Sequence, residues 1–202
     1  QLHFLNHSDV GMERKNRAAL TIHGNKDKQM ILERIKQLPE IDEALIVSNP
    51  LIPSGGMMSI SYKDWEYKKE GAEDVSIEII LESDAYMKFY GMTLLEGEMI
   101  SPSSPSTDIV LNEAAVKALG WHKAVGKHLY GYGGDKHRVI GVVKNWHITS
   151  PTMPIRPSAF QLSNQFGFEG MINVLFKYKE GTWQQCREKV EAIAKEVYPN
   201  AT

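Results

Sequence analysis

Val139-Ile-Gly-Val-Val-Lys-Asn-Trp-His147, followed by Pro154-Ile-Arg-Pro157, is the stretch of sequence that decides the fold. Its apolar run, Val139 to Val143, has the length of a strand and is far shorter than the roughly 20 residues that a membrane helix requires. The prolines that follow favour an extended connection, because proline fixes one backbone angle and removes an N–H donor. The stretch therefore predicts a strand that is followed by an extended segment, through which the chain leaves this part of the fold.

Three further pieces of sequence precede this stretch. They are Asp84-Ala-Tyr-Met-Lys-Phe-Tyr-Gly-Met-Thr-Leu-Leu-Glu-Gly97, Val110-Leu-Asn-Glu-Ala-Ala-Val-Lys-Ala-Leu-Gly120 and Val125-Gly-Lys127. In these pieces, in their order and in the opening stretch, the chain resembles the extracytoplasmic core domain of MacB/FtsX-like ABC transporter permeases. The matching pieces cover about half of the chain.

The resemblance implies an α+β (mixed α/β) fold, with a porter-like lobe of two β-α-β units and an inserted small α/β subdomain. It also implies a cell inner membrane permease, of which this chain is the periplasmic domain between two membrane helices. A cytoplasmic ATPase subunit or domain would hydrolyse ATP, and the membrane helices would transmit the motion. A periplasmic adaptor or envelope protein as partner, and a dimer in the full transporter, are further implications. The implied role is non-catalytic and needs no cofactor: efflux or envelope mechanotransmission.

Composition excludes some classes of partner. The 202 residues suffice for one large domain or two small ones, with 42% hydrophobic and 24% charged residues. A formal charge of -2, with Lys and Arg scattered, gives no electrostatic reason to expect nucleic acid or an anionic membrane surface. The single cysteine, Cys186, cannot form an internal disulfide, so cysteine usage does not indicate the compartment.

The first fifty residues are typical of a β-α-β unit. Ala18 to His23 predicts a strand, Asn25 can cap a helix that ends at Pro39, and Ile41 to Val47 returns as a strand. Such a unit normally gives parallel strands and a right-handed crossover. The apolar face of the helix is formed by Ile31, Ile35 and Leu38.

The middle of the chain alternates short elements with breaks. Val75 to Leu81 has the period of a half-buried strand. Ser83 or Asp84 can cap a short helix, which Gly91 can end in a left-handed conformation. We expect the Ser- and Pro-rich run from Ser101 to Ser106 to be a linker.

A compact β-α-β-β module follows this run. Ile109 to Leu111 predicts a strand, Asn112 caps the helix from Glu113 to Leu119, and glycines at Gly131 to Gly134 predict a β-hairpin. The expected division assigns 1–96 and 151–202 to the porter-like subdomain and 97–150 to the inserted subdomain.

The last elements are a strand, Met171 to Tyr178, and a helix capped by Thr182. The chain begins at Gln1 and lacks a signal pattern, so we expect it to be an excised piece. The resemblance implies that the parent permease has a membrane helix on either side of it. In the resembled family a further strand follows the last helix. We therefore expect an unpaired strand edge in the larger lobe. The buried face of the last helix is formed by Cys186, Val190, Ile193 and Val197.

Two glycine-bearing segments resemble phosphate-binding loops without matching them. Gly131 to Gly134 precedes a predicted strand, whereas a phosphate loop opens a helix. Between Gly120 and Gly126 stand five residues in place of the four of a P-loop, and His128 replaces the Ser/Thr that holds magnesium. We therefore predict that the chain neither binds nor hydrolyses nucleotide.

The histidines do not form a metal-binding pattern. His3 and His7 are four residues apart, but no Glu stands between them as in a zinc protease. His122, His128 and His137 have no Cys companions, and no nucleophile motif accompanies His147. We interpret these four histidines, like His3 and His7, as surface or structural residues.

Other candidate groups also favour structural interpretations. Cys186 lies on an apolar helix face and is expected to be a core residue. Glu96 and Glu98 flank a turn and do not support a paired acid/base role. Met57 and Met58 lie in a Gly-rich stretch and could contact a partner or apolar ligand, although core packing is the preferred interpretation. The sequence assigns no catalytic, cofactor or metal residue, and the residues that bind a ligand or partner stay unknown.

A second function stays open beside force transmission. The chain could be an extracytoplasmic domain that recognises a peptide, lipid or envelope signal, for which an apolar cleft between the subdomains would be evidence. An independent enzyme is disfavoured, because the sequence has no converging set of polar groups and no Gly-x-Ser-x-Gly elbow.

Overall fold

A computed structural model describes residues 2–4, 12–23, 28–47, 58–147, 154–162 and 171–197. The chain forms two compact units. Unit 1 comprises Gln1–Ser8, Arg14–Ile52 and Gln165–Thr202, and unit 2 comprises Asp9–Glu13 and Pro53–Asn164. The chain thus passes between the units four times, and both of its ends belong to unit 1.

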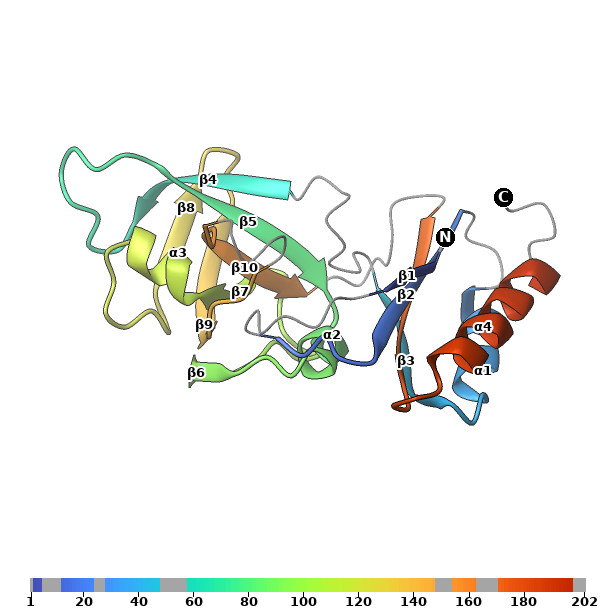
Figure 1. Cartoon of the computed structure of the whole chain (residues 1–202). Coiled ribbons are helices and arrows are strands. Elements are labelled where there is room, and N and C mark those ends of the chain that lie inside the picture. The colour runs from blue at the N-terminus through green and yellow to red at the C-terminus, as the bar shows by residue number, and fades with distance from the viewer. Residues whose placement is uncertain are drawn as a thin grey trace. The chain divides into compact units, whose positions relative to one another are not determined.

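Unit 1 is a four-stranded sheet with two helices on one face (Figure 1). The strands are β1 (Leu2–Phe4), β2 (Arg17–His23), β3 (Ile41–Val47) and β11 (Met171–Tyr178), and the helices are α1 (Lys28–Lys36) and α4 (Trp183–Val197). The order β1-β2-β11-β3 places β11 antiparallel between β2 and β3. The β2-α1-β3 unit was therefore predicted correctly, but its two parallel strands are not neighbours.

The two helices cover the sheet with a shared apolar core. Ile31, Leu32 and Ile35 of α1 are buried against the strands, and the predicted face of α4 is buried at three of its four residues. The fourth, Val197, is partly buried and packs against the same core. The buried α4 residues are Cys186, Val190 and Ile193.

The edge of the sheet beside β2 is occupied by β1. Leu2 pairs with Leu20 and Phe4 with Ala18, antiparallel to β2 and therefore parallel to β11. α4 lies on the same face of the sheet as α1. A right-handed crossover from β11 through α4 would therefore place its next strand beside β2 and parallel to β11, which is where β1 lies. The expectation of an unpaired edge there is wrong over Leu2–Phe4, because a strand from the other end of the chain takes the position.

Unit 2 is built around a sheet that closes on itself. Its order is β6-β9-β7-β10-β5-β4-β8, and β8 also pairs with β9, so that six strands form a ring to which β6 is added (Figure 1). Closure satisfies strand edges that an open sheet leaves unpaired. The strands are β4 (Met58–Trp65), β5 (Val75–Glu82), β6 (Leu94–Gly97), β7 (Asp108–Asn112), β8 (His128–Gly131), β9 (Lys136–Val143) and β10 (Ser158–Leu162).

Alternate side chains of these strands form one core. Ile77, Ile109 and Val139 are fully buried in it, and α3 (Glu113–Ala118) adds Ala115. The side chains of the other set include Phe160, which packs with Tyr86 of α2 (Asp84–Phe89) at a ring distance of 5.9 Å. β10 therefore contributes to both apolar environments, with Ala159 in the core and Phe160 in the other set, whereas the alternate positions of β4 are exposed.

The division into units differs from the expected one. The expected boundaries were 97 and 150, whereas unit 2 extends from Pro53 to Asn164. The reason is strand pairing: β7 and β9 of the expected small subdomain share their sheet with β4, β5 and β10. The run Ser101–Ser106 is accordingly a loop inside unit 2 and does not link the two units.

Close backbone packing joins β6 to β9. A Cβ atom added at Gly141 would lie 2.1 Å from the carbonyl oxygen of Glu98, and one added at Gly97 would lie 2.1 Å from that of Ile140. Gly97 also has φ +71°, in the left-handed region that disfavours side chains. Gly141, the glycine of the fold-deciding stretch, therefore has no room for a side chain.

Candidate functional site

Two of the family-like pieces of sequence, the opening stretch and Val110–Gly120, meet at the start of α3. Asn112 is buried there, and its Oδ1 accepts hydrogen bonds from the backbone N–H of Ala115 at 2.8 Å and of Ser158 at 3.0 Å. Its Nδ2 donates to the carbonyl oxygen of Arg156 at 2.8 Å. One side chain thus caps α3, as the sequence predicted, and also fixes the start of β10, which the sequence did not predict.

Asn145 holds the fold-deciding stretch to the same helix start. Its Oδ1 accepts from the backbone N–H of Ala114 at 2.9 Å, and its own backbone N–H donates to Glu113 Oε2 at 2.8 Å. Trp146, next in the chain, is buried with its ring 4.9 Å from that of Phe160. These contacts give Asn145 and Trp146 structural roles directly after the β9 strand.

An open groove of about 700 Å³ borders this junction. Its lining is mainly apolar, with the charged side chains Glu113 and Lys117 at its margin. The Glu113 carboxylate accepts a backbone hydrogen bond from Asn145, which holds this side chain beside the groove. The remaining lining residues are Ala114, Ala118, Asn145, Ile155 and Pro157.

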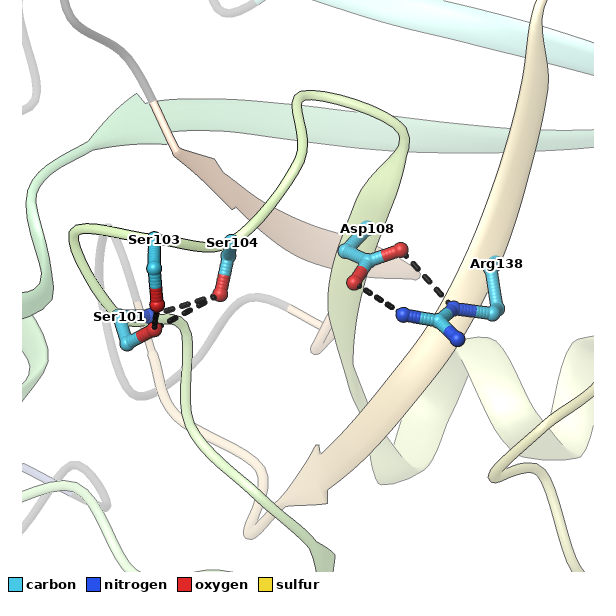
Figure 2. Close-up of polar contacts among 5 residues, drawn as sticks. All are labelled: Ser101, Ser103, Ser104, Asp108 and Arg138. Carbon is cyan, nitrogen blue, oxygen red and sulfur yellow. Dashed lines mark hydrogen bonds and ion pairs between the residues drawn. The ribbon is translucent and has the colours of Figure 1, made fainter.

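An ion pair ties the parallel strands β7 and β9 together near the Ser101–Ser106 loop. Arg138 donates from Nε to Asp108 Oδ1 at 3.0 Å and from Nη2 to Oδ2 at 2.6 Å, with the Asp108 side chain almost fully buried (Figure 2). The carboxylate raises the pKa of Arg138. Such a two-point pair is directional as well as strong, which favours a structural role in fixing strand register.

The loop itself is ordered by its own serines. Ser101 Oγ lies 3.0 Å from Ser103 Oγ and 3.2 Å from Ser104 Oγ, and the backbone N–H of Ser101 donates to Ser104 Oγ at 2.9 Å. Figure 2 shows these hydroxyl groups turned toward one another and away from the Asp108–Arg138 pair. The serines therefore form a local turn network and do not complete a site with the ion pair.

The glycine-bearing segments adopt structural conformations. Gly131 opens the β8–β9 hairpin, where its N–H donates to the carbonyl oxygen of Asp135 at 2.8 Å. Gly120 follows a helix, where a P-loop would lead into one. Lys127 lies with its ammonium group 5.1 Å from the ring centre of Tyr67 and 5.0 Å from that of Trp121. Its charge is thus engaged by aromatic rings.

The histidines are dispersed. His122 is exposed, His128 Nδ1 lies 3.1 Å from Glu66 Oε1, and His147 is half-buried. The side chain of His3, and His7 as a whole, lie outside the described residues. Within the described part of the chain, no three His, Cys, Asp or Glu residues are placed to hold a metal ion.

The remaining candidates also have structural surroundings. Burial raises the pKa of the Cys186 thiol to about 11, so the thiolate nucleophile is scarce at neutral pH. Glu96 accepts from the backbone N–H of Ala124 at 3.4 Å and of Val125 at 3.3 Å, while Glu98 lines a smaller cavity of about 310 Å³. Met58 is exposed, contrary to the preferred interpretation as core, and Met57 lies outside the described residues.

Sequence reasoning missed one buried polar cluster. Tyr62 Oη lies 2.9 Å from His137 Nδ1, and Gln161 Nε2 lies 3.4 Å from His137 Nε2. The three side chains come from β4, β9 and β10, which are remote in sequence. His137 stands between the exposed Lys136 and Arg138, so the sequence of β9 contains no signal of the cluster.

No family model matches the sequence, and no curated protein matches it significantly. Among solved structures, the extracellular domain of the noncanonic ABC-type transporter YknZ from Gram-positive bacteria has a TM-score of 0.56 at 14% identity, covering 89% of this chain and 95% of that one. The periplasmic region of MacB from Actinobacillus actinomycetemcomitans has a TM-score of 0.55 at 14% identity, with 94% and 86% covered. A domain of a putative permease protein from Porphyromonas gingivalis has a TM-score of 0.55 at 12% identity, with 90% and 83% covered.

These likenesses extend over both units and agree with the sequence resemblance. Among the described residues, none of the helices is long and apolar enough to span a membrane. The chain has the α+β fold of the extracytoplasmic domains of MacB- and YknZ-like ABC transporter permeases.

Proposed function

We propose that this chain is the non-catalytic extracytoplasmic domain of an ABC transporter permease, moved by ATP hydrolysis on the other side of the membrane. The observation that carries the proposal is the fold likeness to three such domains over 89 to 94% of the chain. The proposed setting is the periplasmic side of the inner membrane, between two membrane helices. A cytoplasmic ATPase is the proposed partner, and an adaptor or envelope protein and a dimeric transporter complete the proposal.

The connectivity of the units suits the transmission of force. Both chain ends belong to unit 1, so membrane helices attached to them would act on the same unit. Motion of unit 1 would reach unit 2 through four covalent crossings of the chain. Unit 2 can respond as a rigid body, because its ring of strands is closed and filled by side chains.

A direct test follows the motion in the full permease with its ATPase. Tyr132, which is 67% exposed in the β8–β9 turn, would be replaced by Cys and labelled for distance measurement between two copies of the domain. Cys186 is buried and its thiol is weakly acidic, so within these 202 residues native labelling should be selective for the new position. We expect the label distance to change between the nucleotide-free and ATP-bound transporter. An unchanged distance in a transporter that is active would contradict the proposal.

The groove beside α3 keeps a ligand-binding role as the second candidate. Its volume and mainly apolar lining are within the range of small-molecule or peptide sites. Lys117→Glu would reverse one charge at its margin without touching the Asn112 and Asn145 contacts. If the groove recognises a signal, this variant should alter the response to that signal while ATP-driven motion persists. If the domain only transmits force, Lys117→Glu and a control at exposed Lys123 should behave alike.

A further inference from the structure

The Tyr62–His137–Gln161 cluster lies where the ring of strands is closed by β8. Tyr62 is fully buried and His137 is 5% exposed, so water has little access to the imidazole. Tyr62 belongs to β4 and His137 to β9, and both strands pair with β8. The Tyr62–His137 contact thus bridges the two neighbours of the closing strand.

The orientation of the Gln161 amide is fixed by its second contact. Gln161 Nε2 donates to the carbonyl oxygen of Ser106, which can only accept a hydrogen bond. The same nitrogen lies 3.4 Å from His137 Nε2. Because the amide nitrogen is a donor, His137 Nε2 must be the unprotonated acceptor, and the proton of the neutral ring resides on Nδ1, from which it is donated to Tyr62.

Protonation of His137 would reverse this arrangement. A cationic imidazole carries N–H groups at both nitrogens, so Nε2 would become a donor that faces the donor of Gln161. Relief requires rotation of the amide so that Gln161 Oε1 faces the imidazole. The amide oxygen would then face the carbonyl oxygen of Ser106, and that hydrogen bond would be lost.

The groups around His137 set the pH range. Burial lowers the pKa of His137 below its ordinary value of 6.5, and the nearby Asp135 carboxylate acts in the opposite direction. Burial raises the pKa of Tyr62, so the phenol stays neutral throughout. The change therefore lies on the acidic side of the ordinary histidine pKa of 6.5.

The consequence is confined to the Ser101–Ser106 loop. Just beyond Ser106, the chain is held independently, since the backbone N–H of Arg138 donates to the carbonyl oxygen of Thr107 at 2.8 Å and Asp108 binds the Arg138 side chain (Figure 2). Loss of the Gln161–Ser106 bond would thus detach the loop from β10, while β7 stays paired with β9 and the backbone N–H of Asp108 still donates to the carbonyl oxygen of Pro105 at 3.0 Å.

We propose that His137 is a proton sensor within unit 2, and that its protonation turns the Gln161 amide and releases the Ser101–Ser106 loop from β10. The sensor is a property of the chain alone. Its use in response to external pH rests on the proposed extracytoplasmic location, but its test does not require a transporter.

The test is a nuclear magnetic resonance titration of the 202-residue chain from pH 8 to pH 5, observing imidazole, Gln side-chain amide and backbone amide signals. We expect His137 to titrate below pH 6.5, with the Gln161 amide and the amides of the Ser101–Ser106 loop changing at the same midpoint. In His137→Gln these coupled changes should vanish, whereas His128→Gln, which replaces a half-buried histidine on the neighbouring strand, should retain them.

A second variant keeps the sensor and removes the coupling. Gln161→Met deletes the donor that stabilises neutral His137, so the His137 pKa should rise by roughly 0.5 to 1 unit while the loop amides no longer follow it. The proposal is overturned if His137 titrates without a response of Gln161 and the loop. It is equally overturned if His137 stays neutral down to pH 5, or if the loop response persists in His137→Gln.

Discussion

Asn112 and Ser158 are joined by a buried hydrogen bond from the Ser158 backbone N–H to Asn112 Oδ1, at 3.0 Å, between strands that are 46 residues apart in sequence. The same oxygen caps α3, so a local helix signal and a long-range strand contact depend on one atom. This shared acceptor gives the first prediction.

Asn112→Ala should destabilise the protein by about 2 to 4 kcal/mol, because it removes a helix cap and leaves a buried backbone N–H without its acceptor. Ser83→Ala is the matched control, since Ser83 holds the N-cap position of α2 without a side-chain hydrogen bond. Urea unfolding of both variants measures the difference. Equal stability of the two variants would show that neither the cap nor the Ser158 contact of Asn112 contributes.

Gly141→Ala should cost about 3 kcal/mol or more, or prevent folding, because its new Cβ would lie 2.1 Å from a backbone oxygen that cannot move aside freely. Gly120→Ala is the comparison, since a Cβ there meets no atom within 4 Å and only φ +70° opposes it. We expect about 1 to 2 kcal/mol for that strain alone. The order of the two unfolding midpoints decides whether close approach of β6 and β9 limits residue 141.

Stability should fall as the pH drops below about 6.5, the ordinary pKa of histidine, because burial lowers the pKa of His137 in the folded chain. The unfolded chain then binds a proton at a pH where the folded chain does not, and the equilibrium moves toward unfolding. Urea unfolding at pH 8 and pH 5.5 should show a smaller loss for His137→Gln than for the parent. The exposed His122, replaced by Gln, should leave the loss unchanged.

Cys186 should not react with a thiol reagent at pH 8 in the folded protein and should react fully in denaturant. Its thiol is buried and its pKa is raised to about 11, chiefly by burial. Cys186→Ser should cost about 1 to 3 kcal/mol, because a hydroxyl group would enter an apolar core, and Cys186→Ala separates that effect from lost volume. Rapid native labelling would contradict the placement of this residue.

Magnesium-ATP should not bind the chain in calorimetric titration, even at millimolar nucleotide. Gly120 ends α3, and the Lys127 ammonium group lies against Tyr67 and Trp121. A P-loop needs its glycines and lysine ahead of a helix whose N–H groups face the phosphate. Binding at micromolar concentration would refute the structural interpretation of this segment.

Local signals in the sequence determined the elements whose stability is local. The helix-and-strand order around α1, the cap at Asn112 and the hairpin at Gly131 follow from spacing, capping and turn chemistry within a few residues. The buried position of Cys186 follows from periodicity along one helix. The resemblance of the fold-deciding stretch indicated the family of folds that the structure shows.

Only the tertiary structure decided which strands share a sheet. An extended connection was expected through Pro154 and Pro157 and no element directly after it, whereas β10 begins at Ser158 and pairs with β5 and β7 as part of the unit 2 ring. Because β4 and β5 belong to the same sheet as β10, unit 2 begins before β4 and not at the expected residue 97. A strand's backbone hydrogen bonds go to other segments, so its sequence does not identify its partners.

The Tyr62–His137–Gln161 cluster has the same origin. Each residue is ordinary within its own strand, and the proton chemistry arises because three strands bring the side chains within 2.9 and 3.4 Å. Burial, which shifts the pKa of His137, is likewise a property of the packed unit. The sequence alone therefore determined the local elements, while long-range pairing decided the boundaries of the units and the surroundings of the buried His137 imidazole.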